Sequence, residues 1–245
     1  MSDKLLNTAE AATFLRVSQA SVRRWSDGGL LQARRVGRRR ERRFTERDLR
    51  SFMEPAGSTP HVEVPGDVFV GGTHVPVHGH LATFYSRDEG RLRLTIPFLL
   101  DGLRLGQPCF LAASDGVLEA YLAALRREPG LDVDAAVRTG ALVAVNGPGA
   151  TAEGAIEFWE DALSKALAGR PALIRIVGEM ASERKLFSTD SEMMRYEVAF
   201  NLIAKRFPTV TLCQYDVREF DGETIYEVLR AHPDLYDLSV GSLLN

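Results

Sequence analysis

The sequence predicts a mixed α/β protein in two parts, a small basic N-terminal domain and a larger domain built on a parallel sheet. Residues 1–53 hold 13 Lys+Arg and 6 Asp+Glu (net +7), the remainder holds 17 and 27 (net −10), and the two sums give the −3 of the chain. A basic segment of this kind suits a polyanionic partner. In the larger part, apolar runs alternate with segments of helical period, which is typical of a parallel sheet covered on both faces.

Composition and turn residues divide the chain into three segments. Residues 1–53 form the N-terminal domain, residues 54–79 a Pro- and Gly-rich linker with one short strand at most, and residues 80–245 the α/β domain. In the last segment, buried strands are expected at PCFLAAS, ALVAVN, ALIRIVGEM and TLCQYD. Helices separate them, and the helix that begins TAEGAIEF is expected to be capped by Thr151 and to end at Gly169.

The sequence indicates neither a membrane protein nor a disulfide-bonded one. No apolar run reaches the roughly 20 residues that span a bilayer, and no signal-peptide pattern is present, so we expect a cytoplasmic protein. Cys109 and Cys213 lie in strand-like runs without a ligand at metal spacing, which predicts neither a disulfide nor a zinc site. His74, His78 and His80 are close together and hint at a metal, but such a cluster in a glycine-rich linker is more often a polar loop, and we expect no metal and no cofactor.

The basic domain has the pattern of two short helices, a hairpin and a closing helix. We expect Thr8 and Ser18 to cap the first two helices and the glycine pair at 28–29 to end the second. Their inward-facing positions are Ala11, Ala12, Leu15 and Val22. LQARRVGRRRERRFT supplies two strand-like arms around a basic tip at residues 37–40, and Thr45 begins a short helix. This order predicts a winged helix-turn-helix, whose second helix enters a major groove and whose hairpin grips phosphates.

The segments VSQASVRRWSDGGLL and RRVGRRRERRFTERDL resemble the MerR/excisionase (BldC-like) class of winged helix-turn-helix domains. The resemblance implies that the protein binds double-stranded DNA through the recognition helix and the wing, by Gln19, Ser21, Arg23, Arg24, Trp25, Arg38, Arg39 and Arg40. Trp25 falls where the family has an aromatic residue close to the DNA backbone, and a place in the core is the alternative. MerR proteins continue into a dimerising coiled coil, which this sequence lacks, so we expect the C-terminal domain to form a homodimer.

The α/β domain lacks the sequence patterns of nucleotide hydrolysis and of nucleophilic catalysis. The loop from Ser114 to Gly116 is too short for a phosphate-binding loop and has no lysine, and VNGPGATAEG fits neither a Walker motif nor GxGxxG. No GxSxG elbow occurs, and neither cysteine has a histidine nearby in sequence. We therefore expect no enzymatic activity, although an anion bound weakly at the helix after Ser114 stays open.

A second resemblance covers about residues 78–240. HLATFYSRDEGRLRLTIPFLLDGLRLGQPCFLAAS, followed by IRIVGEM, RYEVAFN and LCQYD, resembles the MEDS domain, the sensory module named for methanogen/methylotroph DcmR-type regulators. Such domains are similar to RecA/KaiC-type ATPase folds that have lost the phosphate loop. The resemblance implies that the domain senses a small-molecule effector without turning it over, and that the ligand-binding positions are His80, Tyr85, Arg175, Glu179 and Glu197.

The residues themselves support part of this set. Glu179 lies just past the carboxyl end of a buried strand, where open α/β sheets bind ligands. Arg175 lies in the apolar run ALIRIV and needs a partner if it is buried, for which a carboxylate is the natural choice. A salt bridge or a solvated position is the alternative for Glu179 and Glu197, and capping or packing is the alternative for His80 and Tyr85. If they converge, they suit a small, partly polar organic molecule.

Together these patterns predict a one-component transcription regulator with a DNA-binding head and a sensory domain. Two other interpretations stay open. One is a signalling or interaction protein whose α/β domain binds a protein partner, which would co-purify with it. The other is a DNA-tethered nucleotide-binding enzyme, which a nucleotide-binding assay would reveal.

Overall fold

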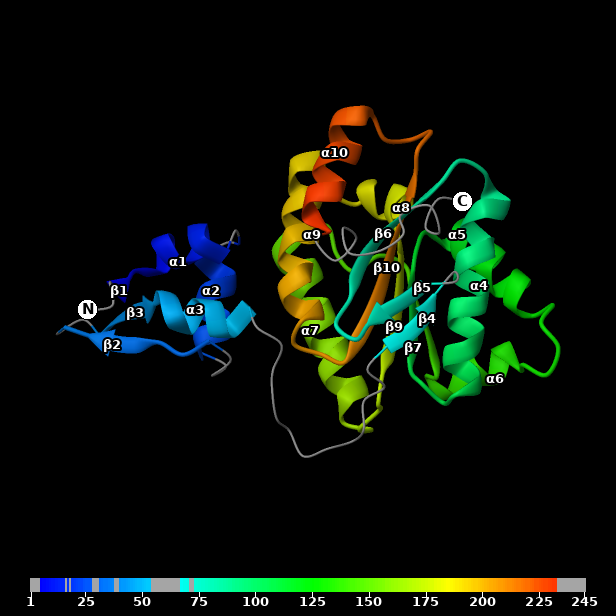
Figure 1. The fold of residues 1–245 in the computed structure, drawn as a ribbon, viewed down its shortest axis with the longest axis horizontal. Helices are drawn as coiled ribbons and strands as arrows, with labels where there is room; N and C mark the ends of the chain where they lie inside the picture. The colour runs from blue at the N-terminus through cyan, green and yellow to red at the C-terminus, as the bar shows by residue number, and fades with distance from the viewer. Residues whose placement is uncertain are drawn as a thin grey trace.

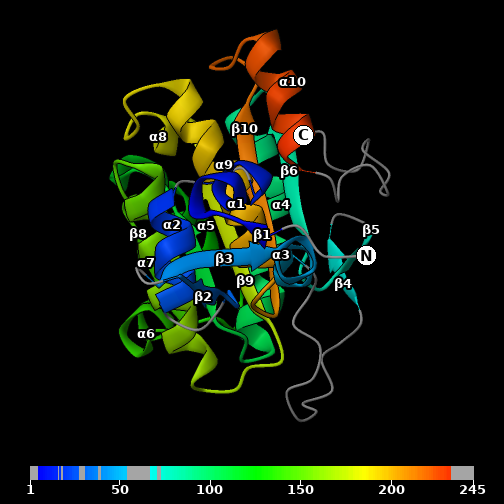
Figure 2. The same cartoon turned by 90° about the vertical axis from the view of Figure 1, so that its left-hand side faces the viewer.

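The computed structural model describes residues 5–15, 17, 19–27, 31–37, 40–53, 67–70 and 73–232. The chain forms two domains, an N-terminal domain followed by an α/β domain. The N-terminal domain lies beside the α/β domain, on the side formed by helices α7 (Ala152–Leu167) and α9 (Asp190–Ala204), as Figure 1 and the rotated view in Figure 2 show.

The N-terminal domain has the predicted order of helix, helix, hairpin and helix. Its elements are α1 (Thr8–Leu15), α2 (Gln19–Asp27), β2 (Arg34–Val36), β3 (Glu41–Thr45) and α3 (Glu46–Met53). A short strand β1 (Leu5–Leu6), which the sequence does not predict, pairs antiparallel with β3 and extends the wing to the order β1-β3-β2. The inward positions of the helices are buried as expected, namely Ala11, Ala12, Leu15 and Val22.

Helix capping in this domain agrees with the sequence at one end and differs at another. Asn7, not Thr8, caps α1: its Oδ1 accepts hydrogen bonds from the N–H groups of Ala9 and Glu10 at 2.8 and 2.9 Å. The Glu10 carboxylate accepts from the N–H of Asn7 in return, which completes a capping box. Thr45 caps α3 as predicted, because its hydroxyl accepts from the N–H of Asp48 at 3.0 Å. Ser18 and the glycine pair at 28–29 lie outside the described residues.

The larger domain contains a five-stranded parallel sheet in the order β6-β10-β9-β7-β8. The strands are β6 (His80–Tyr85), β7 (Cys109–Ala112), β8 (Leu142–Val145), β9 (Ile174–Glu179) and β10 (Thr209–Asp216). The four predicted strands are confirmed, and the fifth, β6, was missed. Its sequence HLATFY mixes His and Thr with apolar residues, yet all six positions are buried.

Helices cover both faces of the sheet, as predicted. In Figure 1, α4 (Asp88–Arg104) and α5 (Asp115–Leu125) lie on one face, and α7, α9 and α10 (Gly222–Ala231) lie on the other. Thr151 caps α7 as expected, since its hydroxyl accepts from the N–H of Gly154 at 3.1 Å. Two short helices were not expected, α6 (Val133–Thr139) and α8 (Met180–Arg184).

The described end of the linker forms a hairpin. Strands β4 (Asp67–Val70) and β5 (Thr73–Pro76) pair antiparallel, so this segment has two strands where the sequence predicted one at most. Val68, Val70 and Val75 are buried, which explains why a Pro- and Gly-rich segment is ordered here. Among the described helices, none combines the length and the apolar character needed to cross a bilayer.

Candidate functional site

The DNA-facing residues predicted on α2 are only partly described. Gln19 and Arg23 lie one turn apart on the exposed side of the helix, and Arg23 Nη2 donates to Gln19 Oε1 at 3.2 Å. Ser21 and Arg24 also belong to α2, but their side chains lie outside the described part of the structure, as do Arg38 and Arg39 in the wing. The exposed side of α2 therefore presents a polar amide and a guanidinium, both of which can reach base edges.

The wing brings arginines directly opposite one another. In the hairpin register, Arg34 faces Arg43 and Arg35 faces Arg42. Like charges at paired positions of an antiparallel ladder are unfavourable, and Glu41 offsets part of this charge through its ion pair with Arg43 at 2.8 Å. Arg40 is exposed in the turn with a left-handed backbone, φ 48°. Phosphate contacts from such a hairpin fix position and contribute affinity on any sequence.

The Trp25 side chain lies in the core, as in the alternative that the sequence left open, and its contact with DNA stays a prediction. The side chain is fully buried, and its Nε1–H donates to Glu160 Oε1 on α7 at 2.6 Å. Its ring packs against Phe52 at 5.0 Å between centroids. Arg206, just after α9, forms an ion pair with Glu160 at 2.7 Å and lies 5.5 Å from the Phe52 ring. We call these four residues, Trp25, Phe52, Glu160 and Arg206, the domain junction.

The five predicted ligand-binding residues do not converge on one pocket. Tyr85 and Glu179 meet at the carboxyl end of the sheet, and Arg175 lies near its amino end. His80 and Glu197 meet in the core between β6 and α9. The expected carboxylate partner of Arg175 is not found among the described residues: its guanidinium donates to Gln107 Oε1 and to the carbonyl of Phe98, each at 2.8 Å.

At the carboxyl end, the Glu179 side chain caps helix α8. It accepts hydrogen bonds from the N–H groups of Ala181 and Ser182, from the Ser182 hydroxyl and from the Tyr85 hydroxyl. Burial, and then the adjacent Glu179 carboxylate, raise the pKa of Tyr85, so this phenol stays protonated and donates. The carboxylate therefore has its acceptor positions filled by the protein itself.

The same edge includes the point where the direction of the chain reverses. Strands β7 and β9 are neighbours, and the chain leaves β7 toward β8 but leaves β9 toward β10. Ligands of open α/β sheets bind at such a point. Here the hydroxyls of Ser114, after β7, and Ser182, after β9, lie 3.1 Å apart. Glu183 is buried beside them, and burial followed by Glu197 and Glu179 raises its pKa well above the usual range, which keeps it neutral.

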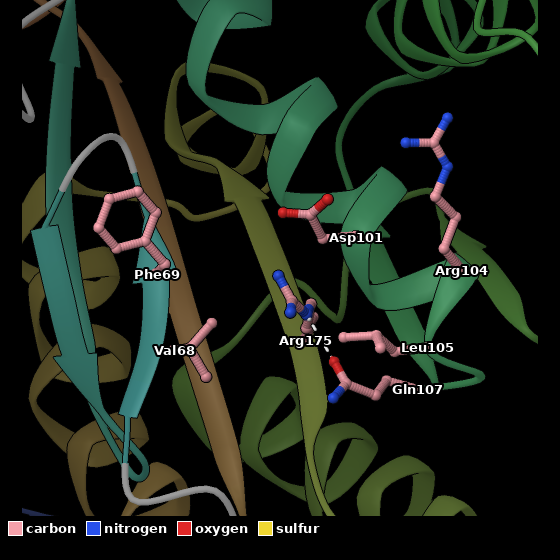
Figure 3. Close-up of a pocket in the computed structure, with 7 residues that line it drawn as sticks. All are labelled: Val68, Phe69, Asp101, Arg104, Leu105, Gln107 and Arg175. Atoms are coloured by element: carbon pink, nitrogen blue, oxygen red, sulfur yellow. Dashed lines mark hydrogen bonds between the residues drawn. The ribbon is translucent and has the colours of Figure 1, made fainter.

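Arg175 borders an open cavity of about 370 Å³ near the amino end of the sheet. Figure 3 shows its lining residues, which combine apolar and charged groups: Val68, Phe69, Asp101, Arg104, Leu105, Gln107 and Arg175. The guanidinium of Arg175 also lies 4.8 Å from the centroid of the Phe98 ring. Gly102 permits this arrangement, because a Cβ at that position would come within 2.6 Å of Arg175 Cδ. Phe69 and Leu105 are 59% and 67% exposed, which is unusual for large apolar side chains.

His80 and Glu197 belong to a cluster that also contains Cys213 and His232. One potential ligand atom from each of the four lies within 4.8 Å of the other three, and all four side chains are buried. Glu197 Oε2 lies 3.1 Å from His232 Nε2 and 3.6 Å from His80 Nε2. Of the three clustered histidines in the sequence, only His80 takes part: His74 is exposed on β5 and His78 is half-buried.

Sequence reasoning missed Cys213 and His232 because the members of this cluster are far apart along the chain. His80 and Cys213 are 133 positions apart and meet only because β6 and β10 are neighbours. Burial raises the pKa of Cys213 well above the usual range, and Glu197 adds to this effect. Burial alone would raise the pKa of Glu197, but His232 and His80 beside it lower that pKa overall.

Comparison with known proteins agrees with this architecture. The family described as the MEthanogen/methylotroph, DcmR Sensory domain (MEDS) matches residues 79–233, and a helix-turn-helix domain family matches residues 5–56. The chain is also 35% identical over 245 residues to the transcriptional repressor DcmR of Methylorubrum extorquens (strain DSM 6343 / CIP 106787 / DM4), a match that covers 96% of this chain and 92% of the repressor.

These matches confirm the predicted helix-turn-helix and the predicted sensory domain. The narrower MerR assignment of the first domain and the RecA-like assignment of the second remain predictions. With a sensory domain matched over most of the α/β part and a helix-turn-helix before it, this chain belongs to the MEDS family of DcmR-type DNA-binding regulators.

Proposed function

We propose that the protein regulates transcription by binding double-stranded DNA through α2 and the wing, and that a small organic effector in the sensory domain changes its affinity for the operator. One observation carries the proposal. Helix α2 exposes Gln19 and Arg23 on one side and buries Trp25 against Glu160 of the sensory domain on the other. Any shift of α7 or α9 at the domain junction therefore reaches the helix that reads DNA.

The cavity beside Arg175 is the proposed effector site. Its volume of about 370 Å³ lies in the usual range for small-molecule sites, and its lining combines apolar walls with a few polar groups. Arg175 and Arg104 offer donors, and Val68, Phe69 and Leu105 offer apolar contact. This combination suits a small molecule with one polar or anionic end. Tyr85 and Glu179 are the weaker candidates, because their polar atoms already bond to one another.

A homodimer is part of the proposal. One small winged domain buries little surface on DNA, so useful affinity calls for two heads on paired half-sites. We infer that the sensory domain supplies the dimer contact. Light scattering of the full chain, with and without operator, tests this. If the protein stays monomeric at every concentration up to the one that saturates the operator, the dimer is not part of the mechanism.

The DNA part is tested with duplexes selected from a random library by the full chain. Arg23→Ala should weaken binding to the selected sequence by about 1–3 kcal/mol and affect random DNA much less, because α2 contacts bases. Arg40→Ala should weaken binding to both kinds of DNA and lower the slope of log K against log salt by about one, because the wing contacts phosphate. Arg127→Ala on the sensory domain is the matched control for loss of one exposed charge. If the slope of log K against log salt is the same for Arg40→Ala, for Arg127→Ala and for the unmodified protein, the wing does not contact phosphate.

The effector part is tested by thermal unfolding with a panel of small carboxylates, alcohols and aldehydes. Leu105→Asp introduces a charge into the cavity at an exposed position, and Val137→Asp does the same at an exposed position on α6, outside the cavity. A compound that raises Tm of the unmodified protein should lose its effect on Leu105→Asp and keep it on Val137→Asp. If both variants respond alike, the effector site lies elsewhere and the carboxyl end of the sheet becomes the candidate.

A further inference from the structure

The buried cluster in the sensory domain has the composition and shape of a metal site. We propose that His80, Glu197, Cys213 and His232 bind one divalent transition-metal ion of the zinc class. The four side chains come from β6, α9, β10 and the residue that ends α10. Two imidazoles, a thiolate and a carboxylate are ligands that Zn²⁺ accepts in proteins. The proposal goes beyond the regulatory function, since it needs neither DNA nor effector.

The orientation of His80 is fixed by a neighbour on the same helix as Glu197. Asn201 Nδ2 donates to the carbonyl of Ala231, so its Oδ1 is the atom that lies 3.0 Å from His80 Nδ1. An amide oxygen only accepts, which means that His80 Nδ1 carries the proton. In the neutral ring, the lone pair of Nε2 then points into the cluster, toward Cys213 Sγ at 3.1 Å. Metal-binding histidines are held in this way by a hydrogen bond from their second nitrogen.

His232 repeats this arrangement. Its Nδ1 lies 2.8 Å from the carbonyl of Val228, which can only accept, so the proton is again on Nδ1. Nε2 then faces Glu197 Oε2 at 3.1 Å, and when the ring is neutral two acceptor atoms meet. By distance and angle, neither atom has a hydrogen-bond partner among the described residues, and the Tyr215 hydroxyl lies beside the same carboxylate. A buried polar atom left in this state is costly, and a cation between the two atoms removes the conflict.

The separations fit a tetrahedral ion. Bonds of about 2.0–2.3 Å to nitrogen, oxygen and sulfur place neighbouring ligand atoms of tetrahedral zinc about 3.3–3.7 Å apart. Three of the six separations are 3.1, 3.1 and 3.6 Å, and all six are within 4.8 Å. The ligand atoms must therefore shift by about 1 Å at most to surround a tetrahedral ion.

The charges also balance. A thiolate and a carboxylate together carry two negative charges, which a divalent ion cancels, so the occupied site adds no net charge to the core. Without an ion, Cys213 is a buried thiol beside Glu197 and His80. With an ion, it is a thiolate ligand, so the occupied site is distinguished by a bond from the metal to sulfur.

The site is structural, because four protein ligands fill a tetrahedral zinc ion and leave no position for a substrate. An ion there joins the end of α10 to α9 and to two neighbouring strands. Helix α9 ends two residues before Arg206 of the domain junction, so occupancy of the site stiffens the element that leads to the DNA-binding head.

The test uses the full chain and Zn²⁺ or Co²⁺ alone. Protein produced in zinc-supplemented medium should contain one zinc per chain by elemental analysis. After unfolding with a chelator and refolding with Co²⁺, it should show the visible bands of tetrahedral cobalt and a thiolate-to-cobalt charge-transfer band. X-ray absorption should find one sulfur among the nearest neighbours of the ion.

Matched cysteine variants identify the ligand. Cys213→Ser should lose the charge-transfer band, and Cys109→Ser, which removes the other buried thiol, should keep it. Absence of zinc from the purified protein together with absence of cobalt uptake on refolding overturns the proposal. A charge-transfer band that survives in Cys213→Ser also overturns it. If Cys213→Ser does not fold, the sulfur count in the unmodified protein decides the question.

Discussion

Two buried glutamates of the sensory domain differ in how the protein satisfies them. Glu179 and Glu197 are each 1% exposed. Glu179 accepts four hydrogen bonds from Tyr85, Ala181 and Ser182. Glu197 Oε2 faces two imidazoles at 3.1 and 3.6 Å and has no hydrogen-bond partner of good geometry among the described residues, with the Tyr215 hydroxyl and the Cys213 thiol beside the carboxylate.

Glu179 therefore has a structural role that the protein itself completes, whereas Glu197 belongs to the site for which we propose a metal ion. A carboxylate with all its acceptor positions filled stabilises the fold and has little to offer a small molecule. A carboxylate that faces imidazole lone pairs leaves a place for a cation. Residue type and burial are the same in both cases, so only the donors around each oxygen distinguish them.

The largest expected effect on stability comes from removing the Glu179 side chain, which caps helix α8. Glu179→Ala leaves buried donors of Tyr85 and Ser182 without an acceptor, which should lower the free energy of unfolding by about 4 kcal/mol. For a chain of this length the melting temperature should fall by about 10 °C. Circular dichroism melting curves measure it, with Glu223→Ala at an exposed position of α10 as the control. A fall no larger than that of the control would show that the cap contributes nothing.

A smaller effect is expected at the other glutamate, and only with metal. Glu197→Gln should lower zinc affinity at least about tenfold, or about 1.4 kcal/mol of metal-dependent stability. Competition with a coloured chelator measures it. Glu183→Gln is the matched control, because burial, then Glu197 and Glu179, raise the pKa of Glu183 and keep it neutral. Equal zinc affinities for the two variants would contradict the assignment of Glu197 as a ligand.

The smallest effect on stability is expected at Asp216, which ends β10 at the carboxyl end of the sheet, as Glu179 ends β9. Asp216 pairs with the exposed Arg218 at 2.6 Å. Hydrogen bonds from Arg218 lower the pKa of Asp216 below its usual range. The pair therefore stabilises the folded state above the unfolded pKa of about 3.9, and this contribution disappears as pH falls through the lower folded value. The melting temperature of Arg218→Ala should lie slightly below that of the unmodified protein at pH 7 and match it near pH 2. A gap that persists in acid would assign the effect to packing.

Much of the fold follows from local sequence patterns. The order of the N-terminal elements, four of five strands and the caps at Thr45 and Thr151 were predicted from periodicity and capping residues. Strand β6 was missed because His80 and Thr83 interrupt its apolar pattern, and tertiary partners permit their burial. The Thr8 cap was wrong because Asn7, one position earlier, is the better-placed acceptor.

The candidate site was less predictable, because residue type does not give distance between strands. Convergence of Arg175 and Glu179 on one ligand was left open, although they lie four positions apart on one strand. At about 3.3 Å per residue that separates them by about 13 Å. Their separation could therefore be predicted from the sequence alone. The cluster around Glu197 was not predictable in the same way, since its members meet only after β6, α9, β10 and α10 have packed.

The burial of Trp25 gives the protein an optical signal of its own. The chain has two tryptophans, and the other, Trp159, is enclosed in the sensory core, where its Nε1–H donates to the Tyr196 hydroxyl at 2.9 Å. If the DNA-binding head leaves the sensory domain, Trp25 enters water and its emission moves to longer wavelength, while Trp159 serves as an internal reference. Undocking of the head can thus be followed in real time, without a label, as effector or operator is added.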